Sequence, residues 1–168
     1  MLSRFYPFEY CSSVYDIDFR SLYKAGYRGI IFDIDNTLVR HNAPVNDTVR
    51  ELIQSLKNIG FDICLLSNNN AKRVNAFGED LDVFHIHRGG KPNTKGYIRA
   101  MALMNTCKGN TVFVGDQIFT DIWGANRAGI HSMLVQPIDK NEGIQIKIER
   151  LPEKLILRSF LTRRKREA

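Results

Sequence analysis

The chain has 168 residues, of which 43% are hydrophobic and 25% charged, and this composition is typical of one folded domain rather than of a disordered protein. Its three cysteines are scattered and form no Cys-x-x-Cys pair, which argues against a disulfide framework or a zinc site and favours a cytoplasmic location. The sequence predicts neither a signal peptide nor a transmembrane segment, because no apolar run approaches ~20 residues. The net charge of +6 favours an anionic partner.

Short apolar runs alternate with segments of helical periodicity through the middle of the chain. The runs predict strands at residues 28–33, 61–66, 83–87, 111–114 and 132–135. Apolar residues at helical spacing predict helices over 45–58, 71–77, 94–104 and 120–128. Such alternation is typical of a parallel sheet, so we expect an α/β, three-layer Rossmann-like domain with helices on both faces of the sheet.

Both ends of the chain lie outside this alternation. We expect a single domain over residues 1–168, with a core at about 28–135, an N-terminal extension over 1–27 and a basic amphipathic C-terminal extension over about 141–168. The N-terminal extension is loosely helical near its end and is expected to pack beside the sheet. In the C-terminal extension, residues 151–161 predict an amphipathic helix that leads into Arg163-Arg164-Lys165-Arg166. Such a basic run either stays solvated or binds an anionic partner.

Polar and charged side chains follow four of the predicted strands, where each strand ends. They are Asp33 and Asp35, Ser67 and Asn68, Lys91, and Asp116 and Asp121. Ligands of an open parallel sheet bind at this edge, so we expect these side chains to lie together. Two like charges ~4 Å apart repel by about 4 kcal/mol at an effective dielectric of 20, so the aspartates predict a bound cation. Oxygen ligands favour Mg²⁺, and Mg²⁺ together with a lysine suits a phosphate dianion.

The spacing of Asp33 and Asp35 predicts a mechanism. Residues two apart in an extended chain point to the same side, so both carboxylates are expected to face one ligand. Asp33 can then attack phosphorus as a nucleophile. Asp35 can donate a proton to the leaving oxygen and later accept one from the attacking water.

The remaining side chains each have a plain structural alternative. Ser67 and the N–H groups beside it can hold phosphoryl oxygens, but the same pattern also caps a helix. Lys91 lies on a turn, where an isolated lysine is usually solvated. Gly115 allows a tight turn that brings Asp116 to the metal. Asp121 coordinates through water, orients the lysine, or only complements a helix dipole.

Four segments match, in order, the four motifs of the haloacid dehalogenase (HAD) superfamily. They are Asp33-Ile34-Asp35-Asn36-Thr37-Leu38, Ser67-Asn68, Lys91-Pro92 and Gly115-Asp116 to Asp121. The resemblance covers about residues 28–135 and implies a Mg²⁺-dependent phosphatase that forms an aspartyl-phosphate.

The resemblance also implies a role for each motif residue. Asp33 resembles the nucleophile of the family, and Asp35 resembles the acid/base of its phosphatases. Asp33, the backbone carbonyl of Asp35 and Asp116 resemble the Mg²⁺ ligands, with Asp121 in support.

Four further residues are expected to bind the phosphate. Ser67 and Lys91 resemble the phosphate-stabilising pair of the family. Asn68 and Thr37, which lie in the same motifs, are included with them.

The spacings between the motifs leave no room for a cap domain once a helix and a strand are fitted into each gap. An uncapped site is open to a bulky substrate, and a neighbouring subunit of a homo-oligomer is another way to complete it. The opening Phe5-Tyr6-Pro7, the run at 66–69 and the basic C-terminal helix resemble the capless subclass IIIA of the YqeG type and phosphatidylglycerophosphate phosphatases. This resemblance implies a phospholipid substrate and a peripheral location at the inner face of a membrane, with the basic helix resting on anionic lipid.

Other interpretations of the sequence compete with a phospholipid phosphatase. A receiver domain also clusters aspartates with a lysine, but its phospho-acceptor follows the third strand, where this chain has His85 and His87. A non-catalytic nucleic-acid-binding protein fits the basic tail, although the chain contains no RNA- or DNA-binding motif, which disfavours nucleic acid. Among phosphatases, the alternative substrates are a phosphoprotein, a nucleotide or a sugar phosphate.

Overall fold

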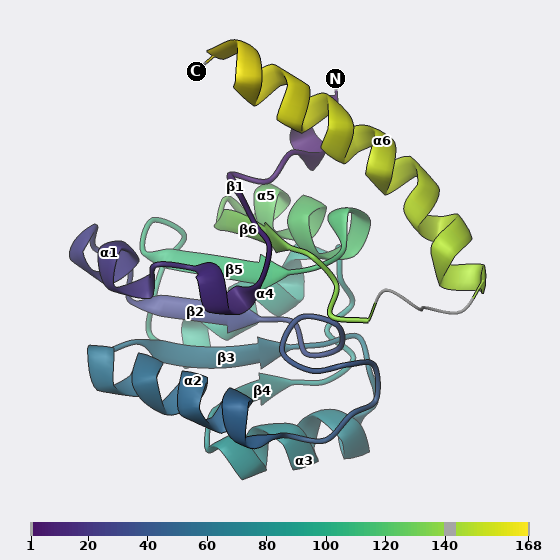
Figure 1. The fold of residues 1–168 in the computed structure, drawn as a ribbon. Coiled ribbons are helices and arrows are strands. Elements are labelled where there is room, and N and C mark those ends of the chain that lie inside the picture. Colours follow the sequence, from purple (N-terminus) through teal and green to yellow (C-terminus); the bar gives the residue numbers. More distant parts are fainter. Residues whose placement is uncertain (1, 140–143, 168) are drawn as a thin grey trace.

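A six-stranded parallel sheet forms the centre of the protein (Figure 1). The computed structural model describes residues 2–139 and 144–167. The strands are β1 (Glu9–Cys11), β2 (Gly29–Phe32), β3 (Asp62–Leu66), β4 (Phe84–Ile86), β5 (Thr111–Gly115) and β6 (His131–Val135). Their order is β1-β6-β5-β2-β3-β4, and every neighbouring pair is parallel. The α/β, Rossmann-like fold expected from the sequence is confirmed.

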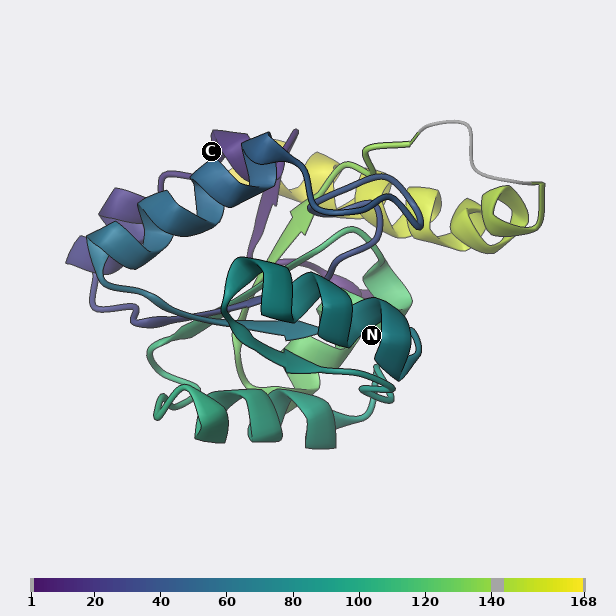
Figure 2. The same cartoon turned by 90° about the horizontal axis from the view of Figure 1, so that it is seen from below.

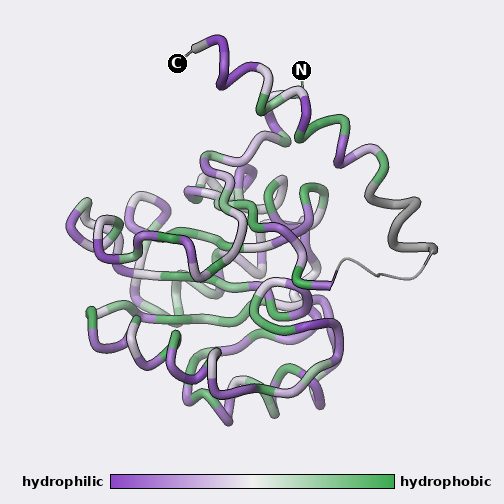
Figure 3. Tube along the Cα trace, viewed as in Figure 1, coloured by the Kyte–Doolittle hydropathy of each residue, from purple (hydrophilic) through white to green (hydrophobic). Residues whose placement is uncertain are grey.

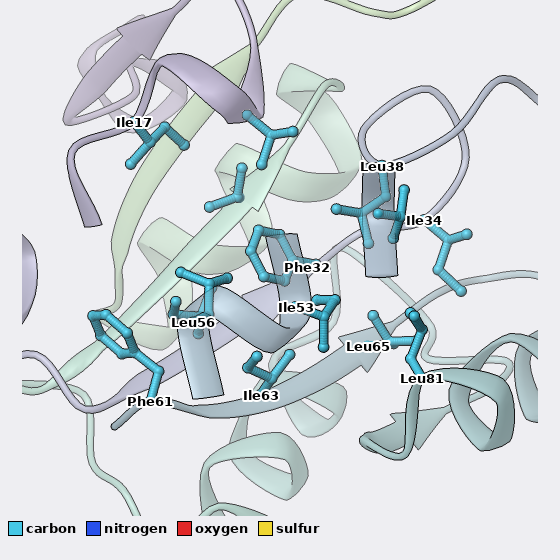
Figure 4. Packing of buried hydrophobic residues seen from close by; sticks show 14 of the residues in the cluster. Ile17, Phe32, Ile34, Leu38, Ile53, Leu56, Phe61, Ile63, Leu65 and Leu81 are labelled. Carbon is cyan, nitrogen blue, oxygen red and sulfur yellow. The ribbon is translucent and has the colours of Figure 1, made fainter. Parts of the chain in front are cut away.

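Helices cover both faces of the sheet, as Figure 2 shows. They are α1 (Phe19–Lys24), α2 (Asp47–Ile59), α3 (Ala71–Leu81), α4 (Thr94–Leu103), α5 (Trp123–Ala128) and α6 (Ile144–Glu167), with short helical turns η1 (Leu2–Phe5), η2 (Val14–Asp16) and η3 (Ile118–Ile122). Phe32 of β2 packs in one apolar cluster with residues of α1, α2 and α3 (Figure 4). Its neighbour Ile31 packs in the opposite cluster with residues of α4 and α5. Successive residues of a strand point to opposite faces, which explains the continuous apolar run of β2.

Asparagine side chains start three of the helices that follow strands. Asn46, Asn70 and Asn93 each accept a hydrogen bond from a backbone N–H group in the first turn of α2, α3 and α4. Gly60 and Gly129 end α2 and α5 in the left-handed conformation that glycine adopts without strain. The helix predicted over 120–128 begins as the π-helical turn η3 and continues as α5. The three asparagine caps lie at the carboxyl edge of the sheet, because α2, α3 and α4 each follow a strand.

The N-terminal extension contributes a strand that the sequence did not predict. β1 pairs with β6 in parallel, so the sheet reaches beyond the expected core of about 28–135. The segment after β1 packs beside the sheet as expected, because Val14, Ile17 and Phe19 are buried in the cluster around Phe32. The chain end therefore closes the β6 edge of the sheet, which would otherwise be open.

The C-terminal extension forms α6, although residues 141–143 of the predicted extension lie outside the described residues. The predicted amphipathic helix is present within α6, and some of its apolar side chains are buried while others stay exposed. Ile156 and Phe160 are each 6% exposed, and Ile156 packs with Ile118, Ile122 and Leu134. These two side chains pack against the domain and are therefore not available to lipid, while the expected contact of the basic helix with anionic lipid stays a prediction. None of the described helices is long and apolar enough to span a membrane.

Candidate active site

The strand ends bring the predicted polar residues together. Asp33 follows β2, Ser67 follows β3 and Asp116 follows β5, while Lys91 lies in the loop after β4. From β2 the chain continues to β3 and β4 on one side, and after β4 it crosses to β5 on the other side of β2, so β2 lies at the switch point of the sheet. A hollow of about 190 Å³ opens there, lined by Asp33, Asp35, Asn36, His41, Ser67, Asn68, Asn69, Lys91, Gln117 and Thr120.

The loop that carries the first motif is anchored in the apolar core. Ile34 and Leu38 are buried and point into the cluster beneath the loop (Figure 4). Asn36 takes a left-handed conformation with φ 66°, which asparagine tolerates better than most residues. The backbone turns tightly here, because the N–H group of Asn36 donates to the carbonyl oxygen of Val39. The core thus fixes Asp33 and Asp35 at the edge of the sheet.

Lys91 is buried between two carboxylates. Its Nζ atom donates to Oδ1 of Asp33 at 2.5 Å and to Oδ1 of Asp121 at 2.6 Å. The lysine side chain is only 3% exposed, so the alternative of a solvated lysine is wrong. Burial alone would lower the pKa of Lys91, but the carboxylates of Asp121 and Asp33 raise it, so the amine stays charged. Burial raises the pKa of Asp33 to about 7, against the opposing effect of Lys91.

Asp121 is held in place by the backbone of the β5 loop. Its Oδ2 atom accepts hydrogen bonds from the N–H groups of Asp116 at 3.2 Å and Gln117 at 3.1 Å. The side chain lies so close to Gly115 that a Cβ atom there would meet Oδ2 at 2.5 Å. Of the alternatives for Asp121, its contact with Lys91 favours the one in which it orients the lysine. Gly115 is needed because of this close approach.

Three carboxylates form a cluster that fits a divalent cation. Ligand atoms of Asp33, Asp116 and Asp121 all lie within 4.8 Å of one another, and all three residues are buried. Thr37 donates its Oγ1 proton to Oδ1 of Asp116 at 3.2 Å, and its expected contact with phosphate stays a prediction. Both carboxylate oxygens of Asp121 accept hydrogen bonds, Oδ1 from Lys91 and Oδ2 from two N–H groups, whereas Lys91 contacts Asp33 at Oδ1, so Asp33 and Asp116 are better placed to bind a cation. Clustered buried carboxylates favour a hard divalent ion with oxygen ligands.

Asp35 contacts donors rather than other carboxylates. Its Oδ1 accepts from the N–H group of Asn42 at 2.8 Å and from Nη2 of Arg73 at 3.0 Å. Its Oδ2 accepts from Nδ2 of Asn69 at 3.3 Å. Arg73 lies on α3, packs over the ring of Phe77 and is only 15% exposed at its side chain. Arg73 was not among the residues expected at the site, because its only signal in the sequence is its place in the first turn of the helix after Ser67-Asn68.

The second motif positions the lysine loop. The Asn68 side chain accepts from the N–H group of Lys91 at 2.8 Å and donates to its carbonyl oxygen at 3.0 Å, so the amide clamps the lysine backbone. Ser67 is buried, and its Oγ accepts from the N–H group of Asn69 at 3.1 Å. The predicted phosphate site therefore includes one residue, Asn68, whose side chain is occupied in holding Lys91. The segment from Ser67 to Asn70 does cap a helix, as the alternative expected, but the capping side chain is that of Asn70 and not that of Ser67.

A parallel sheet with clustered carboxylates and a buried lysine at its switch point is the arrangement of a HAD-type hydrolase. The sequence model of the haloacid dehalogenase-like hydrolases matches residues 39–129. The chain is also 37% identical over 160 residues to the probable phosphatase YqeG of Bacillus subtilis, covering 94% of this chain and 92% of that protein. The chain belongs to the haloacid dehalogenase-like hydrolase family.

The chain is also similar to a longer plant protein and to a solved bacterial structure. The chain is 28% identical over 138 residues to phosphatidylglycerophosphate phosphatase 1, chloroplastic/mitochondrial, of Arabidopsis thaliana. The aligned part covers 75% of this chain but 39% of that longer protein. Among solved structures, a HAD-superfamily hydrolase from Ehrlichia chaffeensis matches with a TM-score of 0.53 and 18% identity, covering 64% of this chain and 89% of that one. This structural match concerns the fold.

Proposed function

We propose that the protein is a Mg²⁺-dependent phosphatase that hydrolyses a phosphate monoester through an aspartyl-phosphate on Asp33. The observation that carries the proposal is the buried ion pair between Asp33 and Lys91 at the switch point of the sheet. The lysine neutralises the approaching phosphate and keeps Asp33 oriented, while the adjoining hollow admits the substrate. The phosphatase name of the relative from Bacillus subtilis supports the same reaction class.

The surrounding residues divide the work of transferring the phosphoryl group. The Ser67 hydroxyl, Lys91 and the backbone N–H groups near Asn68 would hold the phosphoryl oxygens. Asp121 keeps Lys91 in position, as its 2.6 Å contact indicates. Asp33 attacks phosphorus and displaces the alcohol, so the phosphate becomes bonded to the aspartate. Water then attacks phosphorus, releases inorganic phosphate and restores the carboxylate.

Asp33, Asp116 and the backbone carbonyl of Asp35 would hold Mg²⁺. The bound cation would supply charge stabilisation for the transferring phosphoryl group. The buried carboxylate cluster fits this ion, because Lys91 brings one positive charge to a group of three carboxylates. Thr37 supports Asp116 through its hydroxyl hydrogen bond.

Asp35 is the proposed general acid and base. It protonates the leaving oxygen and later takes a proton from the attacking water. The hydrogen bonds from Arg73, Asn69 and the Asn42 backbone fix the position of its carboxylate beside the hollow. The proton donor is thus oriented by groups on two separate loops and one helix.

We propose a phospholipid phosphate, and phosphatidylglycerophosphate in particular, as the substrate. The support is the similarity to the phosphatidylglycerophosphate phosphatase of Arabidopsis thaliana, together with short loops at the hollow. The connections after β2 and β3 span only residues 33–46 and 67–70, so neither contains a cap that would exclude a bulky substrate. The proposed location is the inner face of a membrane. A phosphoprotein, nucleotide or sugar phosphate is the alternative.

The decisive experiment measures phosphate release from a panel of these substrates with and without Mg²⁺. Wild type is compared with Asp33→Asn, and Asp62→Asn serves as a control, since Asp62 lies at the other end of β3. We expect Mg²⁺-dependent turnover in wild type and the control, none in Asp33→Asn, and the highest kcat/KM for phosphatidylglycerophosphate. Full turnover by Asp33→Asn would overturn the mechanism. Preference for a nucleotide or sugar phosphate would overturn only the substrate.

A further inference from the structure

A second, basic hollow lies where the two ends of the chain meet. Figures 1 and 3 show the hydrophilic end of α6 beside the N-terminal segment. The hollow has a volume of about 450 Å³ and is lined by Arg4, Arg163 and Arg164 together with Tyr6, Phe8 and Phe160. Its other lining residues are uncharged, so no acidic side chain lines it within the described part of the chain. It shares no residue with the active-site hollow.

Aromatic rings hold two of the arginines in place. The guanidinium of Arg4 lies 4.8 Å from the ring centre of Phe5 and 6.0 Å from that of Trp123. The guanidinium of Arg164 lies 5.6 Å from the ring centre of Phe160. Stacking of this kind leaves the N–H groups at the edge of the guanidinium able to bind a phosphate in bidentate fashion.

Hydrogen bonds between distant parts of the chain fix the walls of the hollow. Nδ2 of Asn126 donates to the carbonyl oxygens of Arg4 and Tyr6, both at 2.9 Å. The Tyr6 hydroxyl and Ser159 Oγ, on the N-terminal segment and α6, are 2.7 Å apart. The three arginines therefore lie on two segments whose relative position is fixed before a ligand arrives.

Apolar side chains are exposed around the same arginines. Phe8 is 62% exposed, Leu2 49% and Leu161 37%. From Lys154 to Arg166 the sequence of α6 has no acidic residue. Arginines beside exposed leucine and phenylalanine match a bilayer surface, where phosphates lie directly above hydrocarbon. A nucleic-acid backbone offers phosphates but no apolar layer for the leucines.

We propose that this hollow binds the headgroup phosphate of anionic phospholipids and docks the protein on an anionic membrane surface. The bound phosphate is separate from the one that is hydrolysed. The proposal rests on the proposed function in one respect: docking on a membrane is useful to the protein if its substrate lies in that membrane. The docking itself requires neither Asp33 nor Mg²⁺.

The test is co-sedimentation of the full chain with vesicles of phosphatidylcholine, with or without phosphatidylglycerol. We expect binding only when phosphatidylglycerol is present. The double variant Arg4→Gln/Arg164→Gln should bind on the order of 25-fold more weakly, at about fivefold per arginine. The charge-matched control Arg20→Gln/Lys24→Gln, on exposed positions of α1, should lose much less. Phe8→Ser should weaken binding, whereas Ile98→Ser, at a position 55% exposed on α4, should not.

Separate arms identify the source of the phosphate and keep docking apart from catalysis. Asp33→Asn should bind vesicles like wild type, and the double arginine variant should keep wild-type turnover of p-nitrophenyl phosphate. Excess glycerol phosphate should not release the protein from vesicles. Equal losses in the two double variants, release by glycerol phosphate, or displacement by an RNA oligonucleotide that itself binds through Arg4 and Arg164 would each overturn the proposal.

Discussion

The carboxyl edge of the sheet and the layer formed by the chain ends differ in where their charged side chains lie. At the carboxyl edge, charged groups are buried and fully engaged, as in the contacts of Lys91 with Asp33 and Asp121. In the terminal layer, cations remain at the surface while apolar side chains such as Ile156 and Phe160 are buried. One region concentrates electrostatic interactions where chemistry is expected, and the other contributes apolar packing beneath a charged exterior.

This difference predicts that the two regions fail differently when they are altered. Substitutions at the carboxyl edge should change turnover more than stability, because the side chains there are positioned for a ligand. Substitutions beneath α6 should change stability and leave the chemical step intact.

Asp33→Asn should lower turnover by on the order of 10⁴-fold or more, because it removes the proposed nucleophile. The variant should remain folded, since burial already raises the pKa of Asp33 to about 7 and a neutral amide fits that environment. Phosphate release and the thermal unfolding midpoint, measured on the same preparation, check both parts. A variant that loses activity only because it unfolds would remove the support for a nucleophilic role.

Phe160→Ala should lower the free energy of unfolding by about 3 kcal/mol, because a buried aromatic ring is removed from beneath α6. Leu155→Ala on the same helix is the matched control, since that leucine is 67% exposed and should cost less than about 1 kcal/mol. Urea unfolding measures both values. The kcat for p-nitrophenyl phosphate should not change in either variant, and a loss of kcat in Phe160→Ala alone would make α6 part of the catalytic edge.

The two regions also differ in how far the sequence predicts them. Asp33, Lys91 and Asp116 were expected to meet, because parallel strands end at one edge and each residue directly follows a predicted strand or its loop. β1 was not expected, since Glu9–Cys11 is short, half-buried and carries no apolar run. Its partner strand, β6, lies more than a hundred residues away in sequence, and no local periodicity indicates such a pairing.

The contacts within the site were less predictable than its membership. The pair of Asp35 and Arg73 depends on which face of α3 turns toward the loop after β2. Asn68 was expected to bind phosphate, but its amide binds the Lys91 backbone across a loop that the sequence leaves undefined. Motif spacing therefore predicts which residues gather, whereas tertiary packing decides which atoms of those residues are engaged.

Arg73→Gln should lower turnover of an alkyl phosphate by about 10- to 100-fold, because Asp35 loses the guanidinium that orients it as a general acid. Turnover of p-nitrophenyl phosphate should fall much less, since its leaving group departs without a proton. Arg73→Lys should restore part of the activity toward the alkyl phosphate, and the exposed neighbour Lys72→Gln is the charge-matched control. Equal losses on both substrates would show that Arg73 supports the fold rather than the proton donor.

Thr37→Val should have the smallest effect and separates two roles of one hydroxyl. Thr37 donates to Asp116 at 3.2 Å, so its loss should raise the Mg²⁺ concentration for half-maximal turnover by about fivefold, the value of one hydrogen bond near 1 kcal/mol. Thr48→Val, at an exposed position of α2, should leave that concentration unchanged. If Thr37 instead binds phosphate, as its motif implies, the KM for substrate rises and the Mg²⁺ dependence stays as in wild type. The contact with Asp116 favours the first result, because it directs the hydroxyl proton to the cation site.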